Sequence, residues 1–136
     1  MEDIFVARVM STSLHTVGRD TLVEDAGQLM LENNIGSVVV VGEHNELKGI
    51  LTSTDFVDIV AQSHPKAETT VERYMTEDVV TASAQDGIRD AADTMIEHGF
   101  KHLPVVDEDE GVIGMVSTTD LASYLSRVQS PSPVDE

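Results

Sequence analysis

Short apolar runs occur twice along the chain, each followed by a polar turn and a second apolar run. Residues Ser37–Val41 (SVVVV) and His102–Val106 (HLPVV) are too short and too rich in β-branched side chains for helices, so we predict buried strands. The turns EHNE and EDE lead into Leu47–Leu51 and Val112–Val116. A strand, a polar turn and a second strand indicate a β-hairpin in each half of the chain.

Helical periodicity precedes and follows each hairpin. Thr21 and Glu24 have the spacing of a capping box, and apolar residues follow at helical intervals at Leu22, Ala26, Leu29 and Met30. The same stripe returns at Ile88, Ala91, Ala92, Met95 and Ile96, which predicts two amphipathic helices. Further helices are expected over Asp55–Ala61 and Asp120–Arg127, and short extended segments over Leu14–Thr16 and Val79–Thr81.

The two halves are copies of one unit. Shifting the sequence by 65 positions places Val6–Val60 over Val71–Leu125 without a gap. Residues identical in this alignment include the pairs Met10/Met75, Asp25/Asp90, Ala26/Ala91, Met30/Met95, Val40/Val105, Gly49/Gly114 and Asp55/Asp120. We therefore predict two β-α-β-β-α repeats, at 1–62 and 70–128, joined by a polar linker at 63–69. The polar tail 129–136 is expected to be disordered.

Composition narrows the class of protein. The chain has 136 residues, no cysteine and a formal net charge of −17. Such a surface repels phosphate backbones, so nucleic acid is not expected as a partner. We expect a soluble cytoplasmic protein, because no apolar run spans a bilayer and the N-terminus lacks a basic signal region. The acidity favours a halophilic source, since molar salt screens self-repulsion; an acidic mesophilic protein is the alternative.

Two heptapeptides hold the candidate chemistry, GILTSTD at 49–55 and GMVSTTD at 114–120. Each passes from a strand into a helix, so Thr52 or Ser117 lies beside free amide groups that favour an anion such as phosphate. Three residues later, Asp55 or Asp120 can accept both hydroxyls of a ribose. The same spacing also describes a helix cap that satisfies itself, and spacing alone leaves both interpretations open.

The duplicated unit resembles the CBS domain, and two in tandem resemble a Bateman module. VGEHNELKGILTSTDF, HLPVVDEDEGVIGMVSTTDL and YMTEDVVT carry the resemblance, which covers residues 4–127. It implies an α/β (α+β) fold with repeats related by pseudo-two-fold symmetry, each a small three-stranded sheet packed with two helices. It also implies that the Thr/Ser and Asp positions hold the phosphate and ribose of an adenosine ligand in the cleft between the repeats.

The resemblance assigns a ligand-binding set to each copy, with adenine lying between the first short strand and the start of the second. In the first copy the set is Thr16, Val17, Ile35, Gly36, Ser37, Val38, Thr52, Thr54 and Asp55. In the second copy it is Thr81, Ala82, Phe100, Lys101, His102, Leu103, Pro104, Ser117, Thr119 and Asp120.

The copies differ beside these residues. Lys101 and His102 replace Gly36 and Ser37, so cationic donors for a phosphate are expected mainly near the second copy. Phe100 is interpreted as a core anchor rather than a base-stacking platform, and Pro104 as an edge or bulge of its strand. The run DEDE at 107–110 and the scattered histidines lack metal-site spacing, so no metal site and no required cofactor are expected.

The resemblance therefore implies a non-enzymatic sensor that binds AMP, ADP, ATP or S-adenosylmethionine and signals to an effector protein. The resemblance implies a homodimer formed through helical faces. A structural or interaction protein with vestigial sites is the alternative, and an enzyme is a third class without a recognisable nucleophile. In the sensor hypothesis, a ligand shifts the relative orientation of the repeats only by its difference in affinity for the two states.

Overall fold

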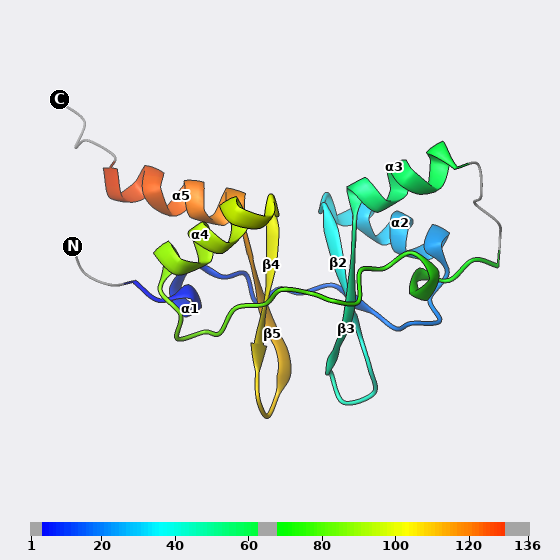
Figure 1. The fold of residues 1–136 in the computed structure, drawn as a ribbon, viewed down its shortest axis with the longest axis horizontal. Helices are drawn as coiled ribbons and strands as arrows, with labels where there is room; N and C mark the ends of the chain where they lie inside the picture. The colour runs from blue at the N-terminus through cyan, green and yellow to red at the C-terminus, as the bar shows by residue number, and fades with distance from the viewer. Residues whose placement is uncertain (1–3, 63–67, 130–136) are drawn as a thin grey trace. The chain divides into compact units, whose positions relative to one another are not determined.

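The fold follows the predicted order of elements in both halves. A computed structural model describes residues 4–62 and 68–129 (Figure 1), so most of the predicted linker lies outside the described residues, as does the predicted disordered tail except for Gln129, which is helical. The elements are α1 (Val6–Val9), β1 (Thr16–Val17), α2 (Val23–Asn33), β2 (Ser37–Val41), β3 (Leu47–Thr52), α3 (Ser53–Ala61), the 3-10 turn η1 (Val71–Arg73), α4 (Ile88–His98), β4 (His102–Asp107), β5 (Gly111–Ser117) and α5 (Thr118–Gln129).

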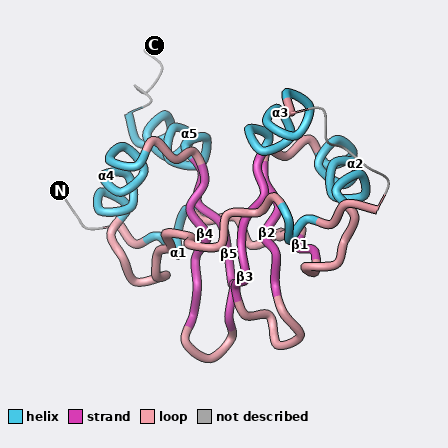
Figure 2. The backbone as a smooth tube through the Cα atoms, turned by 45° about the vertical axis from the view of Figure 1, so that its right-hand side comes forward, coloured by secondary structure: helices cyan, strands magenta, loops and turns pink. Residues whose placement is uncertain are grey.

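The chain forms two compact units whose boundaries differ from those of the sequence repeats. Unit 1 consists of Met1–Thr12, Thr81–Asp107 and Ile113–Glu136, and unit 2 of Ser13–Val80 and Glu108–Val112. Each unit thus takes its opening segment from the other repeat: α1 packs with α4 and α5, and Val71 of η1 lies in the core of unit 2. In both units the helices lie over one end of a β-hairpin (Figure 2).

Matching backbone hydrogen bonds hold the exchanged segments. In unit 2 the amide of Val71 donates to the carbonyl of Thr21 at 2.8 Å, and in unit 1 the amide of Val6 donates to the carbonyl of Asp86 at 2.7 Å. Farther along, Ile50 exchanges two hydrogen bonds with Thr76, as Met115 does with Ser11. The exchange is therefore the same in both units.

The repeated glycine of each heptapeptide allows this close approach. A Cβ atom on Gly49 would lie 2.7 Å from Sδ of Met75 and 2.8 Å from the carbonyl oxygen of Thr76. A Cβ atom on Gly114 would lie 2.6 Å from Sδ of Met10. Both contacts are shorter than packed atoms tolerate, so a side chain at either position would displace the exchanged segment.

The two sheets differ by one strand. Unit 2 has the order β1-β2-β3, with β1 parallel and β3 antiparallel to β2, whereas β4 and β5 form a two-stranded sheet in unit 1. In the part of unit 1 that the structure describes, the expected third strand is reduced to the bridge Ala82↔Val105, the counterpart of Val17↔Val40. Pro104 stands where unit 2 has Val39, which pairs with Thr16. Proline has no amide proton for a second bridge.

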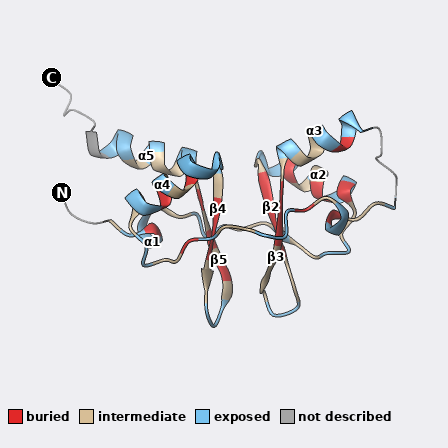
Figure 3. Cartoon of the chain, in the orientation of Figure 1, coloured by how far each residue is buried: buried red, intermediate tan, exposed pale blue. Residues whose placement is uncertain are grey.

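The cores of the units use equivalent positions (Figure 3). Buried pairs include Val6/Val71, Ala26/Ala91, Met30/Met95, Val38/Leu103, Val40/Val105 and Leu51/Val116. Apolar burial at about 25 cal/mol per Å² is the main stabilising contribution to such cores. The two units therefore have the same core packing. No helix of the described residues is long and apolar enough to cross a membrane.

Two local features depart from the sequence analysis. The capping box predicted at Thr21 and Glu24 is wrong: α2 begins after Leu22 without a side-chain cap. Instead, the Thr21 hydroxyl accepts a hydrogen bond from the amide of Gly18 at 3.1 Å, so a turn uses it. The helical turns α1 and η1 were not predicted, because a single turn carries no periodic signal.

Candidate functional site

The first candidate site lies where β3 passes into α3. Thr52 ends the strand in an extended conformation and is the N-cap residue of the helix. Its partner across the sheet is Ser37, and the next residue, Ser53, donates its amide to the carbonyl of Gly36 at 3.0 Å. The pairing of β1 with β2 adds Thr16 and Val17 to the same sheet. Three segments of the first-copy set, which contain Thr16, Gly36 and Thr52, therefore lie in the same region of unit 2.

Unit 1 repeats the arrangement at the junction of β5 and α5. The amide of Thr118 donates to the carbonyl of Lys101 at 3.0 Å, and the amide of Ala82 donates to the carbonyl of Pro104 at 2.9 Å. These bonds place the start of β4 beside the first turn of α5. The second-copy set is thus gathered within unit 1 in the same way.

Both aspartates cap their helices. Oδ2 of Asp55 accepts the amide of Thr52 at 2.8 Å and its hydroxyl at 3.3 Å. Oδ2 of Asp120 accepts the amide of Ser117 at 2.9 Å, while the Ser117 hydroxyl accepts the amide of Asp120 at 3.1 Å. The cap interpretation is therefore confirmed as a structural role. It occupies part of each carboxylate, which offers about four acceptor positions in all.

The predicted residues differ in what they can offer a ligand. Five of the predicted residues are buried, namely Ser37, Val38, Ala82, Leu103 and Pro104. Their side chains belong to the core, so only their backbone groups can contact a ligand. Partly exposed residues are Val17, Ile35, Gly36, Thr52, Asp55, His102, Ser117 and Asp120. Exposed residues are Thr16, Thr54, Thr81, Phe100, Lys101 and Thr119.

Phe100 is not the core anchor predicted from the sequence. Its side chain is 38% exposed, and its ring stacks on that of His98, with centroids 5.1 Å apart and planes 18° from parallel. The left-handed Gly99 between them ends α4 and redirects the chain. The aromatic pair therefore lies on the surface of unit 1, at the end of that helix.

The two candidate sites differ in their charged residues. Burial lowers the pKa of the His102 imidazole, the charge of Asp120 opposes this by raising it, and Lys101 lowers it further. These three groups therefore act on one another at the start of β4. The corresponding positions beside Asp55 are Gly36 and Ser37, which carry no charge.

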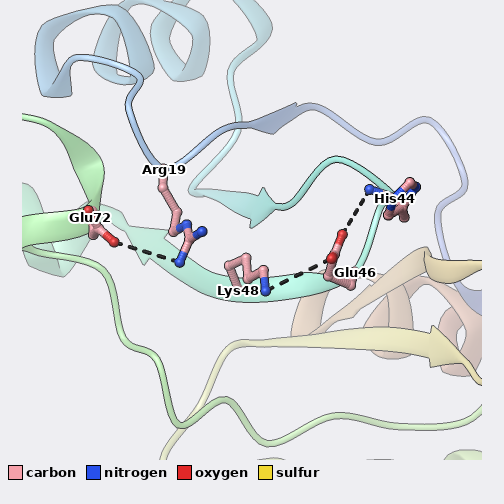
Figure 4. Close-up of polar contacts among 5 residues, drawn as sticks. All are labelled: Arg19, His44, Glu46, Lys48 and Glu72. Carbon is pink, nitrogen blue, oxygen red and sulfur yellow. Dashed lines mark hydrogen bonds and ion pairs between the residues drawn. The ribbon is translucent and has the colours of Figure 1, made fainter.

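Two basic side chains of unit 2, Arg19 and Lys48, have acidic partners (Figure 4). Nη1 of Arg19 lies 3.8 Å from Oε2 of Glu72, and both side chains are half exposed. Nζ of Lys48 lies 3.9 Å from Oε2 of Glu46, whose other oxygen accepts the amide of His44. Exposed pairs of this kind contribute about 0–1 kcal/mol, and both cations have an acidic partner other than Asp55.

A pocket of about 530 Å³ adjoins the first candidate site. From α2 and its cap it is lined by Gly27, Met30, Leu31 and Asn34. Beyond the helix it is lined by Ile35, Gly36, Ser53 and Phe56. Only Ile35 and Gly36 of these were predicted as site residues. The sequence signal available for the rest was Leu31, an apolar residue that lies outside the predicted stripe of Leu22, Ala26, Leu29 and Met30. No cluster of three or more potential metal ligands occurs among the described residues.

The CBS domain family model matches residues 6–62 and 71–127. A 17.7 kDa protein of Acidianus ambivalens is 34% identical over 125 residues, which cover 92% of this chain and 75% of the relative. The homoserine O-acetyltransferase of Methanosalsum zhilinae is 33% identical over 121 residues, which cover 89% of this chain. The chain spans only 24% of that enzyme's length, so the similarity concerns a part of it.

Solved structures share the fold. The CBS domain pair of protein MJ0100, in complex with 5'-methylthioadenosine and S-adenosyl-L-methionine, superposes with a TM-score of 0.86 at 26% identity, covering 94% of this chain and 100% of that one. An acetoin utilization protein (AcuB) from Vibrio cholerae gives a TM-score of 0.85 at 27% identity, covering 99% of both chains. CBSX2 in complex with AMP gives 0.83 at 24% identity, with 92% and 98% covered, which supports the fold alone.

Proposed function

Because the chain belongs to the CBS domain family as a tandem pair, we propose that it is a non-enzymatic regulatory module that binds an adenosine-containing ligand and signals to a partner protein. One observation carries the proposal: a hydroxyl residue and an aspartate occupy the first turn of a helix, beside the start of a buried strand, in both units. MJ0100, a similar CBS pair, binds two adenosine derivatives.

The helix N-terminus and the aspartate carboxylate favour different parts of a ligand. Free amides at a helix N-terminus attract a phosphate or another anion, and the carboxylate accepts hydrogen bonds from a ribose diol. Backbone groups of Val38 and Leu103 border the predicted base position. Lys101 and His102 favour a phosphorylated ligand, such as AMP or ADP, at the second site, while the first site, which has Gly36 and Ser37 in their place, suits adenosine derivatives without phosphate.

The ligand would act by stabilising one arrangement of the repeats, and the changed surface would be read by an effector protein. A homodimer belongs to this proposal, since exposed apolar residues occur on the helices of both units. The net charge of −17 supports a halophilic setting, in which salt at about 1 M reduces the screening length to about 3 Å.

One observation favours a second candidate function. Because both aspartates already satisfy helix caps, the heptapeptides could be purely structural and the module an interaction protein with vestigial sites. The two candidates differ in one measurable property, because a vestigial module has no affinity for adenosine ligands.

The decisive experiment is a thermal-shift and calorimetric panel of AMP, ADP, ATP and S-adenosylmethionine at molar salt. A ligand at about 100 times its dissociation constant adds about 2.7 kcal/mol to the free energy of unfolding. In the Asp120→Ala variant we expect affinity for AMP to fall by about 1.5–3 kcal/mol, the value of a hydrogen bond to a charged group. Loss of the cap also destabilises the variant by about 1 kcal/mol, so stability alone cannot separate the candidates.

Asp120→Asn is the matched variant, because it keeps an oxygen for the cap and removes the charge. We expect nearly wild-type stability with weakened AMP binding. Absence of any stabilisation across the panel, with folded protein, would contradict the sensor function and support the structural alternative.

A further inference from the structure

The tip of the β4–β5 hairpin belongs to a different unit from most of its two strands. Residues Glu108–Val112 are part of unit 2, whereas Thr81–Asp107 and Ile113–Glu136 are part of unit 1. The chain therefore leaves unit 1 at the end of β4 and re-enters it after the start of β5. The contacts that hold this tip within unit 2 determine how firmly the hairpin connects the two units.

Asn45, in the turn between β2 and β3, holds the tip through its side chain and its backbone. Its Nδ2 donates to the carbonyl oxygen of Glu110 at 2.9 Å and to that of Val112 at 2.8 Å. The amide of Val112 in turn donates to the carbonyl oxygen of Asn45 at 3.1 Å. Because a side-chain amide has two N–H groups, one asparagine can bind the carbonyls on both sides of Gly111.

The turn presents Asn45 in a conformation that suits this contact. Its φ of 65° lies in the left-handed region, which asparagine adopts more readily than most residues. The amide of Asn45 donates to the carbonyl of Gly42 at 3.1 Å, and the amide of Gly42 donates to the carbonyl of Glu46 at 2.9 Å. The Glu46 carboxylate accepts the amide of His44 at 2.9 Å (Figure 4). These bonds hold the turn in shape independently of the tip.

Gly111 allows the tip to approach Asn45. A Cβ atom on Gly111 would overlap the carbonyl oxygen of Asn45 and would lie 2.7 Å from its carbonyl carbon. The φ of Gly111 is also positive, at 78°, and glycine adopts this conformation without steric cost. Both the available space and the backbone conformation therefore require glycine at this position.

The contact is not symmetric between the two copies of the repeat. Under the shift of 65 positions, Glu110 corresponds to Asn45 and Glu46 corresponds to Gly111. An ionised glutamate accepts hydrogen bonds and cannot donate them. The first copy therefore supplies the side-chain donor, and the second copy supplies the glycine that lets it approach.

We propose that Asn45 and Gly111 form a clamp that makes β5 one continuous connection between the units. The clamp lies at the starting ends of β3 and β5, which end at Thr52 and Ser117, the hydroxyl residues of the two candidate sites. With its tip held, β5 opens as a whole rather than fraying from Gly111. In the proposed sensor, a change at Ser117 would reach unit 2 along this strand, a consequence that rests on the proposed function.

Hydrogen exchange of backbone amides, measured by NMR on the full chain without ligand, tests the clamp. The amide of Val112 donates to Asn45 in unit 2, and the amide of Met115 donates to Ser11 in unit 1 at 3.0 Å, so the two amides report on both ends of β5. In wild type we expect similar protection of the two. Asn45→Gly keeps a left-handed turn and removes the side-chain donor, and should speed exchange of Val112 relative to Met115 by at least about tenfold.

Asn34→Gly is the matched control. Asn34 is also left-handed, with a φ of 53° at the end of α2, so the same chemical change is made outside the hairpins. It should leave the ratio of the Val112 and Met115 exchange rates unchanged. Gly111→Ala should raise this ratio, because the added Cβ displaces the tip. The double variant with Asn45→Gly should then exceed the larger single effect by no more than about twofold, since both changes open one clamp.

Each outcome decides one part of the proposal. An unchanged ratio in Asn45→Gly would overturn the clamp, and so would equal acceleration of both amides, because Asn45 would then contribute only to overall stability. Saturating AMP should slow exchange of Val112 in wild type and not in Asn45→Gly, and equal slowing in both would refute transmission along β5. Absence of AMP binding would contradict the proposed function and this transmission with it, while the ratio measured without ligand still decides the clamp.

Discussion

The two units share one framework and differ at their surfaces. Equivalent residues fill both cores, and equivalent backbone hydrogen bonds hold the exchanged opening segments. At the entry to the second strand, however, unit 2 has Gly36 and Ser37 where unit 1 has Lys101 and His102. Packing and backbone pairing therefore maintain the repeat, while the two positions at the strand entry are free to give each copy its own binding chemistry.

The largest expected effect concerns the shared framework. Leu51→Ala removes a fully buried side chain from unit 2 and should reduce the free energy of unfolding by about 2–5 kcal/mol. Val116→Ala at the equivalent position of unit 1 should cost less, because valine loses fewer carbon atoms. Urea unfolding measures both. Glu77→Ala, an exposed control, should stay within about 0.5 kcal/mol of wild type, and equal effects of all three variants would refute the duplicated core.

The charged difference between the sites should control ligand choice. Replacing Lys101→Ala together with His102→Ser makes the second site resemble the first, and should weaken AMP relative to adenosine by about tenfold, or about 1.4 kcal/mol. Calorimetry with both ligands gives the ratio. Lys48→Ala removes a lysine that is already paired with Glu46 and should leave the ratio unchanged. An unaltered ratio in the double variant would show that these cations do not contact the phosphate.

One component of the pH dependence of stability should arise in unit 1, from His102. Burial lowers the pKa of His102 in the folded state, so the unfolded chain takes up its proton first, near a pKa of about 6.5. The free energy of unfolding should therefore decrease as the pH falls from about 6.5 through the lowered folded-state pKa. His102→Ser should remove this component when its urea unfolding is compared with wild type at each pH. Parallel curves for the two proteins would contradict the prediction.

The smallest expected effect concerns the pocket. A Cβ atom on Gly27 would lie 3.2 Å from Cε1 of Phe56, whereas unit 1 has Ala92 and Leu121 at these positions. We expect Phe56→Leu to cost less in the Gly27→Ala background than in wild type, with a coupling energy of about 0.5–1 kcal/mol. A double-mutant cycle of urea unfolding measures it, and additive effects would show that the two side chains do not share this space.

The sequence predicted what local patterns determine. The runs SVVVV and HLPVV became β2 and β4, and the Thr52 and Ser117 segments became helix caps, because these features depend on neighbouring residues. The exchange of opening segments was not predictable, since Val71 joins residues such as Val23 in a core that only the folded chain assembles. Thr21 was misread because a hydroxyl suits a turn as well as a cap, and the surface position of Phe100 depends on the left-handed Gly99 that ends α4.

We propose that each aspartate binds a ribose and that the cations beside Asp120 add selectivity for phosphate. Titration of AMP into wild type, Asp55→Ala and Asp120→Ala at molar salt tests it most directly. We expect Asp120→Ala to lose the tighter binding of AMP and Asp55→Ala to retain it. Equal AMP affinity in all three folded proteins, or no binding to any of them, would contradict the claim.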